Sequence, residues 1–301
     1  MHVSDEVATA LVEGRGVVAL ETTIVVQGLP EPINLEVARE CELAVRVAGS
    51  VPATIGVVKG RVVVGLSSKE LEELADPRVG AAKLSARDIG VAVGLGLNGA
   101  TTVAGTIVVA RRAGIDVMAT GGLGGVHRDA ATSFDESADL TALSRTSVVV
   151  VASGVKSILD IGATLERLDT LGIPVVGYRT RRFPGFYRSD SGFEIDWSLP
   201  DATAVAAAFL AHRTYSSSGL LLANPVSREH QLDESLHERA LESALAKARA
   251  LGTTSKAVTP VLLAEFARFT DGRSVRVNRE LVVANARVGG EVAVAVAAAQ
   301  G

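Results

Sequence analysis

The sequence contains little cysteine and few aromatic side chains. Its 301 residues include one cysteine, one tryptophan, three tyrosines and seven phenylalanines. A single cysteine excludes an internal disulfide. Cys41 falls on the apolar side of a predicted helix with Leu35, Ala38 and Val45, so we expect it to serve packing. The scarcity of aromatics, together with 30 glycines, favours helices packed closely on a sheet over a β-sandwich.

Two further features are missing: an excess of one charge and a long apolar run. The formal net charge is −4, and no basic stripe with interleaved aromatics occurs, which argues against a nucleic-acid-binding protein. The apolar run 148–152 is only strand-sized, well short of a membrane span. The N-terminus lacks the basic-then-apolar order of a signal peptide. We therefore expect a soluble, cytoplasmic protein.

Short β-rich runs alternate with helical patterns along the whole chain. The predicted strands are 17–21, 24–26, 54–58, 61–64, 91–93, 115–119, 147–151, 174–178 and 219–223. The predicted helices are 34–49 with Asn34 as N-cap, a short one opened by Ser67 and Glu70, 101–113, 157–171, and those that fill 233–301. This alternation predicts a layered α/β fold, and no domain boundary is visible, so we expect one compact domain over 1–301. The irregular stretch 180–200 is predicted to be a functional loop.

The residues 94–100, Gly-Leu-Gly-Leu-Asn-Gly-Ala, match the G-x-G-x-x-G/A pattern of dinucleotide-binding loops. That pattern needs a strand before it, a helix after it, and an acidic residue at the end of the next strand. Here the next predicted strand has Asp116 near its start and ends at Thr120-Gly121. We therefore interpret the glycines as turn and packing residues.

A glycine-rich loop follows the predicted strand 115–119. Its sequence, Ala-Thr-Gly-Gly-Leu-Gly-Gly-Val-His-Arg over 119–128, has four glycines in five positions. Such a backbone can bring N–H groups close to an anion, and His127 at its end could bond a phosphate. A flexible surface turn with a solvated histidine is the alternative interpretation.

Lys156 and Glu21 are the candidate reactive side chains. Each follows an apolar strand-like run, where desolvation favours the uncharged form of an amine or a carboxylic acid. A neutral lysine amine can attack an electrophilic carbon and form a Schiff base, and a carboxyl group can donate a proton. A solvated lysine at a helix start, and a strand-end carboxylate facing water, are the alternatives.

The segment 134–140 and Lys83 are further candidates. A single carboxylate in this segment could bind a hard divalent cation together with waters and substrate oxygens, whereas zinc would require clustered His or Cys. Helix capping explains the same residues without a metal. Lys83 is a candidate phosphate ligand, and a solvated lysine at a helix end is the alternative.

Taken together, these segments resemble the pseudouridine-5′-phosphate glycosidase family, also called the indigoidine synthase A-like family. The resemblance covers nearly the whole chain, in several long motifs that follow one another in order. The motifs are ALETT (19–23), GLP (28–30), VPATI (51–55), NGATTV (98–103), ATGGLGGVHR (119–128), FD with SADL (134–140), GVKSILD (154–160) and ANP (223–225).

The resemblance implies a three-layer α/β/α fold with a central mixed sheet and a homotrimer. It implies that Lys156 is the nucleophile, that Glu21 is the proton donor, and that Asp135 binds a divalent metal, typically Mn2+, with Mg2+ or another ion possible. Substrate contacts are implied for Lys83, Val103, His127, Ser137, Ala138 and Asp139, and for an asparagine near the C-terminus, where we favour Asn285 over Asn278.

The implied reaction is the reversible cleavage of pseudouridine 5′-phosphate to uracil and ribose 5-phosphate through a lysine imine. Asp139 could share proton transfer with Glu21. Two alternatives keep parts of this interpretation: a Schiff-base lyase or aldolase acting on another sugar phosphate, and a non-catalytic sugar-phosphate-binding protein. The second would need neither a nucleophilic lysine nor an acid beside it.

Overall fold

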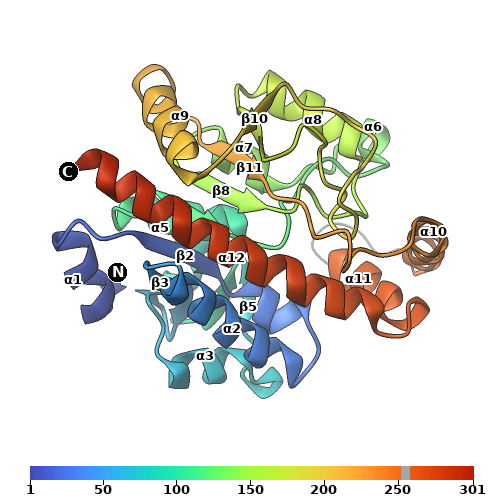
Figure 1. The fold of residues 1–301 in the computed structure, drawn as a ribbon. Helices are drawn as coiled ribbons and strands as arrows, with labels where there is room; N and C mark the ends of the chain where they lie inside the picture. Colours follow the sequence, from blue (N-terminus) through green and yellow to red (C-terminus); the bar gives the residue numbers. More distant parts are fainter. Residues whose placement is uncertain (252–257) are drawn as a thin grey trace.

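The centre of the molecule is a mixed β-sheet built from strands along most of the chain (Figure 1). The computed structural model describes residues 1–251 and 258–301. Within them, eleven strands form one sheet in the order β1-β4-β3-β2-β7-β8-β11-β9-β10, with β6 and β5 added beside β3. The strands are β1 (His2–Val3), β2 (Val17–Glu21), β3 (Val51–Val58), β4 (Arg61–Val64), β5 (Ala82–Leu84), β6 (Gly99–Thr101), β7 (Val117–Ala119), β8 (Val149–Ala152), β9 (Val175–Tyr178), β10 (Trp197–Leu199) and β11 (Leu220–Ala223).

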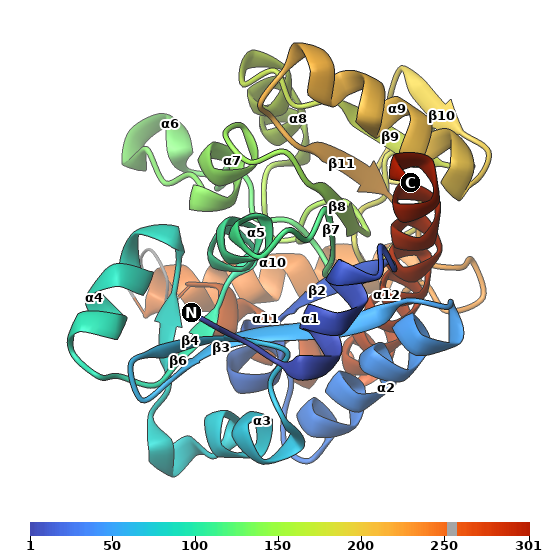
Figure 2. The same cartoon turned by 90° about the vertical axis from the view of Figure 1, so that its left-hand side faces the viewer.

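Helices cover both faces of this sheet, which gives three layers. One face carries α2, α9 and α12, and the other carries α5 and α7 (Figure 2). The helices are α1 (Asp5–Val12), α2 (Ile33–Val47), α3 (Ser68–Ala75), α4 (Ile89–Gly94), α5 (Val103–Arg112), α6 (Ala130–Ser133), α7 (Ala138–Leu143), α8 (Ile161–Thr170), α9 (Ala202–Tyr215), α10 (Glu234–Ala250), α11 (Val258–Phe269) and α12 (Arg273–Gln300), with the short turns η1 (Ile24–Gly28), η2 (Pro77–Val79) and η3 (Ala86–Asp88). The expected three-layer α/β/α fold with a mixed sheet is confirmed.

The central strands are apolar because the sheet is covered on both sides. Strands β2, β7, β8 and β11 pair in parallel with their neighbours along the sheet, and every residue of β8 and β11 is buried. Parallel strands covered on both faces have continuous rather than alternating apolar sequences. Antiparallel pairing occurs where β3 meets β4 and β6, which confirms the predicted hairpin over 54–64.

Three sequence-based assignments were wrong. Residues 24–26 belong to the π-helix η1 rather than to a strand. Asn34 lies inside α2 instead of capping it, since its side-chain amide donates to the Val25 carbonyl at 2.9 Å. Residues 91–93 lie in the helix α4 rather than in a strand. Apolar runs this short do not distinguish a strand from a buried or partly buried helix.

The α4 assignment also bears on the G-x-G-x-x-G/A pattern. Gly94 is the last residue of α4, and the loop that follows leads into strand β6. The order is therefore helix, loop and strand, the reverse of what a dinucleotide site needs. This agrees with the interpretation of these glycines as turn residues.

Most helical predictions hold, with shifted boundaries. Helix α5 begins at Val103 after Thr102, and α8 begins at Ile161 after Asp160. The predicted capping box of Ser67 and Glu70 is present on α3. The stretch 180–200 is mostly irregular and carries only the short strand β10. Within the helical prediction for 233–301, residues 252–257 lie outside the described residues.

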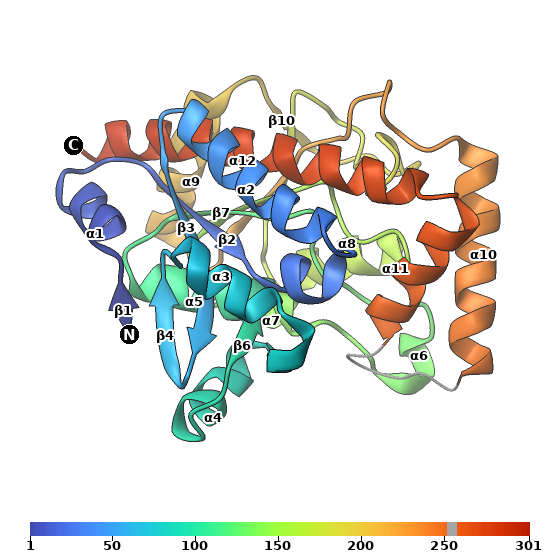
Figure 3. The same ribbon diagram turned by 90° about the horizontal axis from the view of Figure 1, so that it is seen from below.

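The C-terminal helix α12 packs across the central strands of the sheet. It crosses β2, β7 and β8 and packs on α2 and α9 (Figure 3). By length and composition it could cross a membrane, although more than half of its most apolar window is buried inside the protein. Its apolar residues Leu281, Val292 and Val296 belong to the main core, so its apolar character is explained by packing.

The contact of α12 with α2 depends on the absence of a side chain at Gly290. A Cβ at this position would stand 2.6 Å from the Ala48 Cβ and 3.1 Å from the Val45 carbonyl oxygen. Neither backbone can move without separating the two helices, and such overpacking typically costs about 1–3 kcal/mol. The two helices can approach as closely as they do only because position 290 is glycine.

We predict that Gly290→Ala lowers the free energy of unfolding by about 1 kcal/mol, because the clash outweighs the gain in helix propensity. Gly90→Ala in α4 is the matched control, since no heavy atom lies within 4 Å of its added Cβ, and it should stabilise by about 0.4–1 kcal/mol. Urea unfolding of both variants measures the difference. Equal stabilisation by both would contradict the close contact.

Candidate active site

The candidate site lies where three parallel strands of the sheet end. Strand β2 ends at Glu21, the glycine-rich loop follows β7, and the Lys156 loop follows β8. The chain leaves β2 toward β3 on one side and leaves β7 toward β8 on the other. Ligands of open α/β sheets bind at such switch points, outside the carboxyl ends of the strands.

The side chain of Glu21 is buried and hydrogen-bonded at both of its carboxylate oxygens. The Thr23 hydroxyl donates to Oε2, and the Thr120 hydroxyl donates to Oε1. Glu21 is only 8% exposed, yet it lines the cavity. Glu21 therefore lies in the cavity wall, with two hydroxyl partners that the sequence did not indicate.

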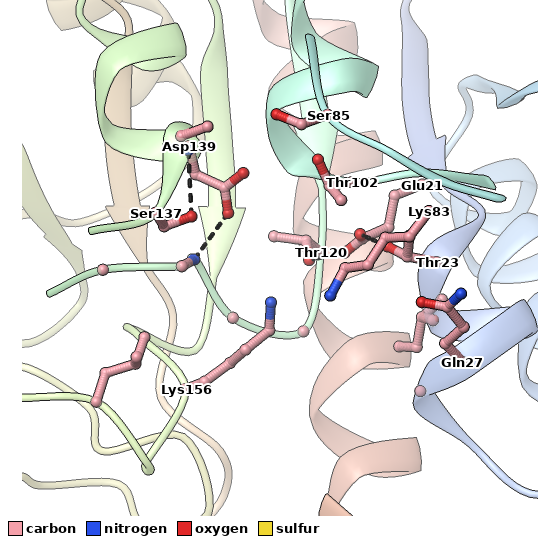
Figure 4. Close-up of a pocket in the computed structure, with 18 of the residues that line it drawn as sticks. Glu21, Thr23, Gln27, Lys83, Ser85, Thr102, Thr120, Ser137, Asp139 and Lys156 are labelled. Carbon is pink, nitrogen blue, oxygen red and sulfur yellow. Dashed lines mark hydrogen bonds between the residues drawn. The ribbon is translucent and has the colours of Figure 1, made fainter. Parts of the chain in front are cut away.

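Lys156 is held in place by the glycine-rich loop. The two loops run side by side: Ser153 N–H donates to the Gly121 carbonyl at 2.9 Å, and Leu123 N–H donates to the Gly154 carbonyl at 3.0 Å. Lys156 N–H then donates to the Leu123 carbonyl at 3.1 Å. The backbone on both sides of the lysine is fixed, and its side chain points into the cavity (Figure 4).

Lys83 reaches the same cavity from the other half of the sheet. Beyond the end of β2, strand β6 takes its place beside β3, where Ala100 pairs with Gly56. Strand β5 pairs with β6 and carries Lys83 in its middle. The amine of Lys83 points into the cavity that also receives the amine of Lys156 (Figure 4), so Lys83 is a strand residue rather than one at a helix end.

Asp139 joins the glycine-rich loop to the start of α5. Its Oδ1 accepts from Ala104 N–H at 2.9 Å, and its Oδ2 accepts from Gly124 N–H at 2.9 Å. The carboxylate is 4% exposed. A Cβ at position 124 would stand 2.2 Å from the Ser137 Oγ and 2.6 Å from Asp139 Oδ2, so the glycine permits this close approach. Both oxygens of Asp139 are thus used in holding the site together.

The resulting cavity has a volume of about 300 Å³. This is the lower end of the range for small-molecule sites. Of the predicted site residues, it brings together the following: Glu21, Lys83, His127, Asp135, Ser137, Ala138, Asp139 and Lys156. Val103 is 1% exposed and does not line the cavity, although its neighbour Thr102 does.

The two candidate asparagines of α12 occupy different depths. Asn285 is fully buried outside the cavity lining: its amide nitrogen donates to the Thr120 carbonyl at 2.8 Å, and its Oδ1 accepts from Asn224 at 2.9 Å. Asn278 lines the cavity, and its buried Oδ1 has no hydrogen-bond partner. This geometry argues against our preference for Asn285 and favours Asn278 as the residue that contacts a ligand.

Several lining residues escaped the sequence analysis. They are Gln27 from η1, Ser85 and Arg87 beyond β5, Phe186 from the 180–200 segment, and Leu263 from α11. The hydroxyl of Ser85 is buried without a partner. Only the irregular, aromatic character of 180–200 signalled one of them. Buried polar atoms without partners are uncommon in native proteins, so Ser85 and Asn278 mark two polar positions for a ligand.

Phe186 lines the cavity and belongs to an aromatic cluster behind it. It has a left-handed backbone with φ of 64°, an arrangement that is costly for a bulky residue and concentrates at functional sites. Its ring packs edge-on against Tyr187, whose ring stacks near Phe266. His237 lies behind them, where burial lowers its pKa to about 4. The uncharged imidazole therefore packs among these rings.

His127 and Asp135 are the candidate metal ligands. The ring nitrogen Nε2 of His127 lies 3.9 Å from Asp135 Oδ2. The backbone N–H of His127 donates to the backbone carbonyl of Asp135 at 3.1 Å. Residues 1–251 and 258–301 contain no group of three His, Cys, Asp or Glu side chains arranged for a metal. One partly exposed carboxylate fits a hard ion that keeps most of its waters, and does not fit zinc.

The sequence profile described as "Indigoidine synthase A like protein" matches residues 6–295. The chain belongs to this family. It is 58% identical over 297 residues to the pseudouridine-5′-phosphate glycosidase of Salinispora tropica, covering 98% of this chain and 91% of that one. It is 53% identical to the protein of the same name from Saccharopolyspora erythraea, covering 98% and 97%.

Two solved structures agree with this fold. The prealnumycin C-glycosynthase AlnA, in complex with ribulose 5-phosphate, superposes with a TM-score of 0.91 at 42% identity, covering 99% of this chain and 97% of that one. An indigoidine synthase A-like protein from Thermotoga maritima gives 0.89 at 38% identity, covering 98% and 96%.

We predict that Asp139→Asn destabilises the protein by about 1–3 kcal/mol. The asparagine can accept from only one of the two N–H groups, and its own NH2 would face the other, leaving a buried donor unpaired. Chemical unfolding measures the loss. The matched control is Asp129→Asn, an exposed aspartate whose side chain caps nothing, which should change stability by less than about 0.5 kcal/mol. Similar stabilities for the two variants would count against the bridging role.

Proposed function

We propose that this protein is an enzyme that reversibly cleaves the carbon–carbon glycosidic bond of pseudouridine 5′-phosphate to uracil and ribose 5-phosphate. One observation carries the proposal: the Lys156 amine and the buried Glu21 carboxylate open into one cavity beside a glycine-rich loop. Relatives 50–58% identical over nearly the whole chain are named for this activity.

An amine provides a route that avoids expelling an unstable carbanion. Expelling uracil from an intact ribose ring would leave a poorly stabilised carbanion. If the ribose ring opens, Lys156 can bond to the former anomeric carbon. Protonation of the uracil carbon then allows the carbon–carbon bond to break as the nitrogen lone pair forms an imine. Water releases ribose 5-phosphate and restores the amine.

The cavity offers separate polar positions for the two ends of the substrate. Glycine-rich backbone, the Ser137 start of α7 and the cationic Lys83 suit a phosphate, since N–H groups and a positive charge favour an anion. Asn278, with its unpartnered amide oxygen, and the apolar Phe186 and Leu263 suit the base. Binding at both ends would position the ribose carbon at Lys156.

The two acidic groups then have different functions. Glu21 is the group available for proton transfer, because it lines the cavity and only hydroxyls bond its carboxylate. Asp139 is occupied by two backbone N–H groups, so we assign it the positioning of the glycine-rich loop. A divalent ion such as Mn2+, or Mg2+, would be held by Asp135 with His127 beside it, where it would neutralise substrate charge.

We also propose a cytoplasmic homotrimer. The homotrimer comes from the likeness to the family rather than from the geometry of one chain. Light scattering of the purified protein tests the assembly, since a trimer of a 31.1 kDa chain differs clearly from a monomer or dimer. A monomer with full activity would remove this part of the proposal without affecting the site.

We predict that Lys156→Ala lowers kcat by at least about a thousandfold, because the variant lacks the amine that we assign to the covalent imine. Wild-type protein given pseudouridine 5′-phosphate should release uracil, and borohydride should fix a sugar phosphate on Lys156, visible by peptide mass. The exposed Lys69→Ala is the control and should keep both signals. Uracil release without an adduct would exclude the imine intermediate but not the cleavage reaction.

We predict that Asp135→Ala raises the Mn2+ concentration needed for half-maximal activity at least tenfold, since the variant lacks the carboxylate that we assign to the ion. Electron paramagnetic resonance of free Mn2+ measures binding without turnover. The neighbouring Asp129→Ala should leave the titration unchanged. Identical Mn2+ titrations of wild type and Asp135→Ala would exclude Asp135 as the metal ligand.

A further inference from the structure

The hydrogen bonds around Glu21 bear on its charge before catalysis. A carboxylate accepts hydrogen bonds at both oxygens, whereas a carboxylic acid must donate one. Glu21 accepts from Thr23 at one oxygen and from Thr120 at the other. Hydrogen bonds to the charged form favour that form and oppose the effect of burial. One hydroxyl at each oxygen is an arrangement in which a carboxylate can accept at both positions.

The two threonines are themselves fixed from different directions. Thr23 follows β2 within two residues of Glu21, and Thr120 follows β7, with its carbonyl held by the buried amide of Asn285 at 2.8 Å. Both hydroxyls lie in the cavity wall. The adjacent Thr22 is different, because its hydroxyl donates to the Ile55 carbonyl at 2.9 Å and accepts from Thr101 N–H at 2.8 Å.

We propose that Thr23 and Thr120 are positioning residues that hold Glu21 as an ionised carboxylate in the resting site, so that Glu21 accepts a proton before it donates one. This inference rests on the proposed function. The proton comes from the ammonium of Lys156, directly or through a water or substrate hydroxyl. One N–H bond breaks on Lys156, one O–H bond forms on Glu21, and the total charge is unchanged. The transfer yields the neutral amine that can attack and the acid that can protonate the leaving base.

Other charges in the cavity do not change when a threonine is replaced. Besides Glu21, the charged or titratable groups that face the cavity are Lys83 from β5, Arg87 from η3, Lys156 from the β8 loop, His127, Asp135 and Glu136 from the loop around α6, and Asp139 from α7. Strand β3 contributes none next to Glu21, and α12 contributes the uncharged Asn278. A shift in a threonine variant therefore reports the lost hydroxyl.

The test is the pH dependence of kcat/KM for uracil release in Thr120→Val and Thr23→Val. Each valine removes one donor from the carboxylate at nearly constant volume. The acidic limb of the profile should move up by about one pH unit in each variant, since a hydrogen bond to a charged group contributes about as much as one unit. Thr120→Ser and Thr23→Ser restore the hydroxyl and should return the limb to the wild-type position.

Thr22→Val is the matched control, and its acidic limb should stay in the wild-type position whatever its effect on the rate. A limb that stays in place in Thr23→Val and Thr120→Val, or an alkaline limb that moves instead, would overturn the proposal. A carbon-13 titration of glutamate-labelled protein, with Glu21→Gln identifying the signal, follows the same midpoint without turnover. If wild type releases no uracil, the proposed function fails while this titration still tests the threonines.

Discussion

The site depends on one carboxylate that holds two backbone segments together. Asp139 accepts from the first turn of α5 with one oxygen and from the glycine-rich loop with the other. The same loop is hydrogen-bonded along its length to the segment that carries Lys156. A displacement at Asp139 would therefore move the loop, the lysine and the start of α5 together. Positioning of this kind matters because misplacement by an ångström can cost two orders of magnitude in rate.

The parallel sheet brings the residues of the site together at one edge. Strands β2, β7 and β8 end at the same edge, so Glu21, Thr120 and the Lys156 loop meet there although they lie far apart in the sequence. The shortness of β2 is equally important. Because β2 ends at Glu21, strand β6 can pair with the rest of β3 and bring β5 with Lys83 across the gap. The cavity exists because one strand stops and another replaces it.

The sequence identified the reactive groups better than their surroundings. Glu21 and Lys156 each end or follow a short apolar strand, where a charged side chain is a candidate for function, and the family motifs around them supported that interpretation. The alternative interpretation of Lys83 as a lysine at a helix end was wrong, because β5 and β6 are three-residue strands with no recognisable local pattern. The pairing of β6 with β3, and of β5 with β6, makes them strands. The strand prediction for residues 91–93 was wrong because an apolar run of that length suits either a strand or a helix.

Asn278 and Asn285 show what pattern alone cannot decide. They are seven residues apart on α12, so they share one face of the helix, and nothing in the sequence separates them. They differ in depth. Asn285 donates to the carbonyl of Thr120 beneath the loop, whereas Asn278, about two helical turns away, lines the cavity with an unpartnered amide oxygen. The deeper amide fixes Thr120, which in turn bonds Glu21. Two identical side chains on one helix thus lie at different distances from the cavity: Asn278 lines it, and Asn285 fixes the backbone of Thr120 beneath it.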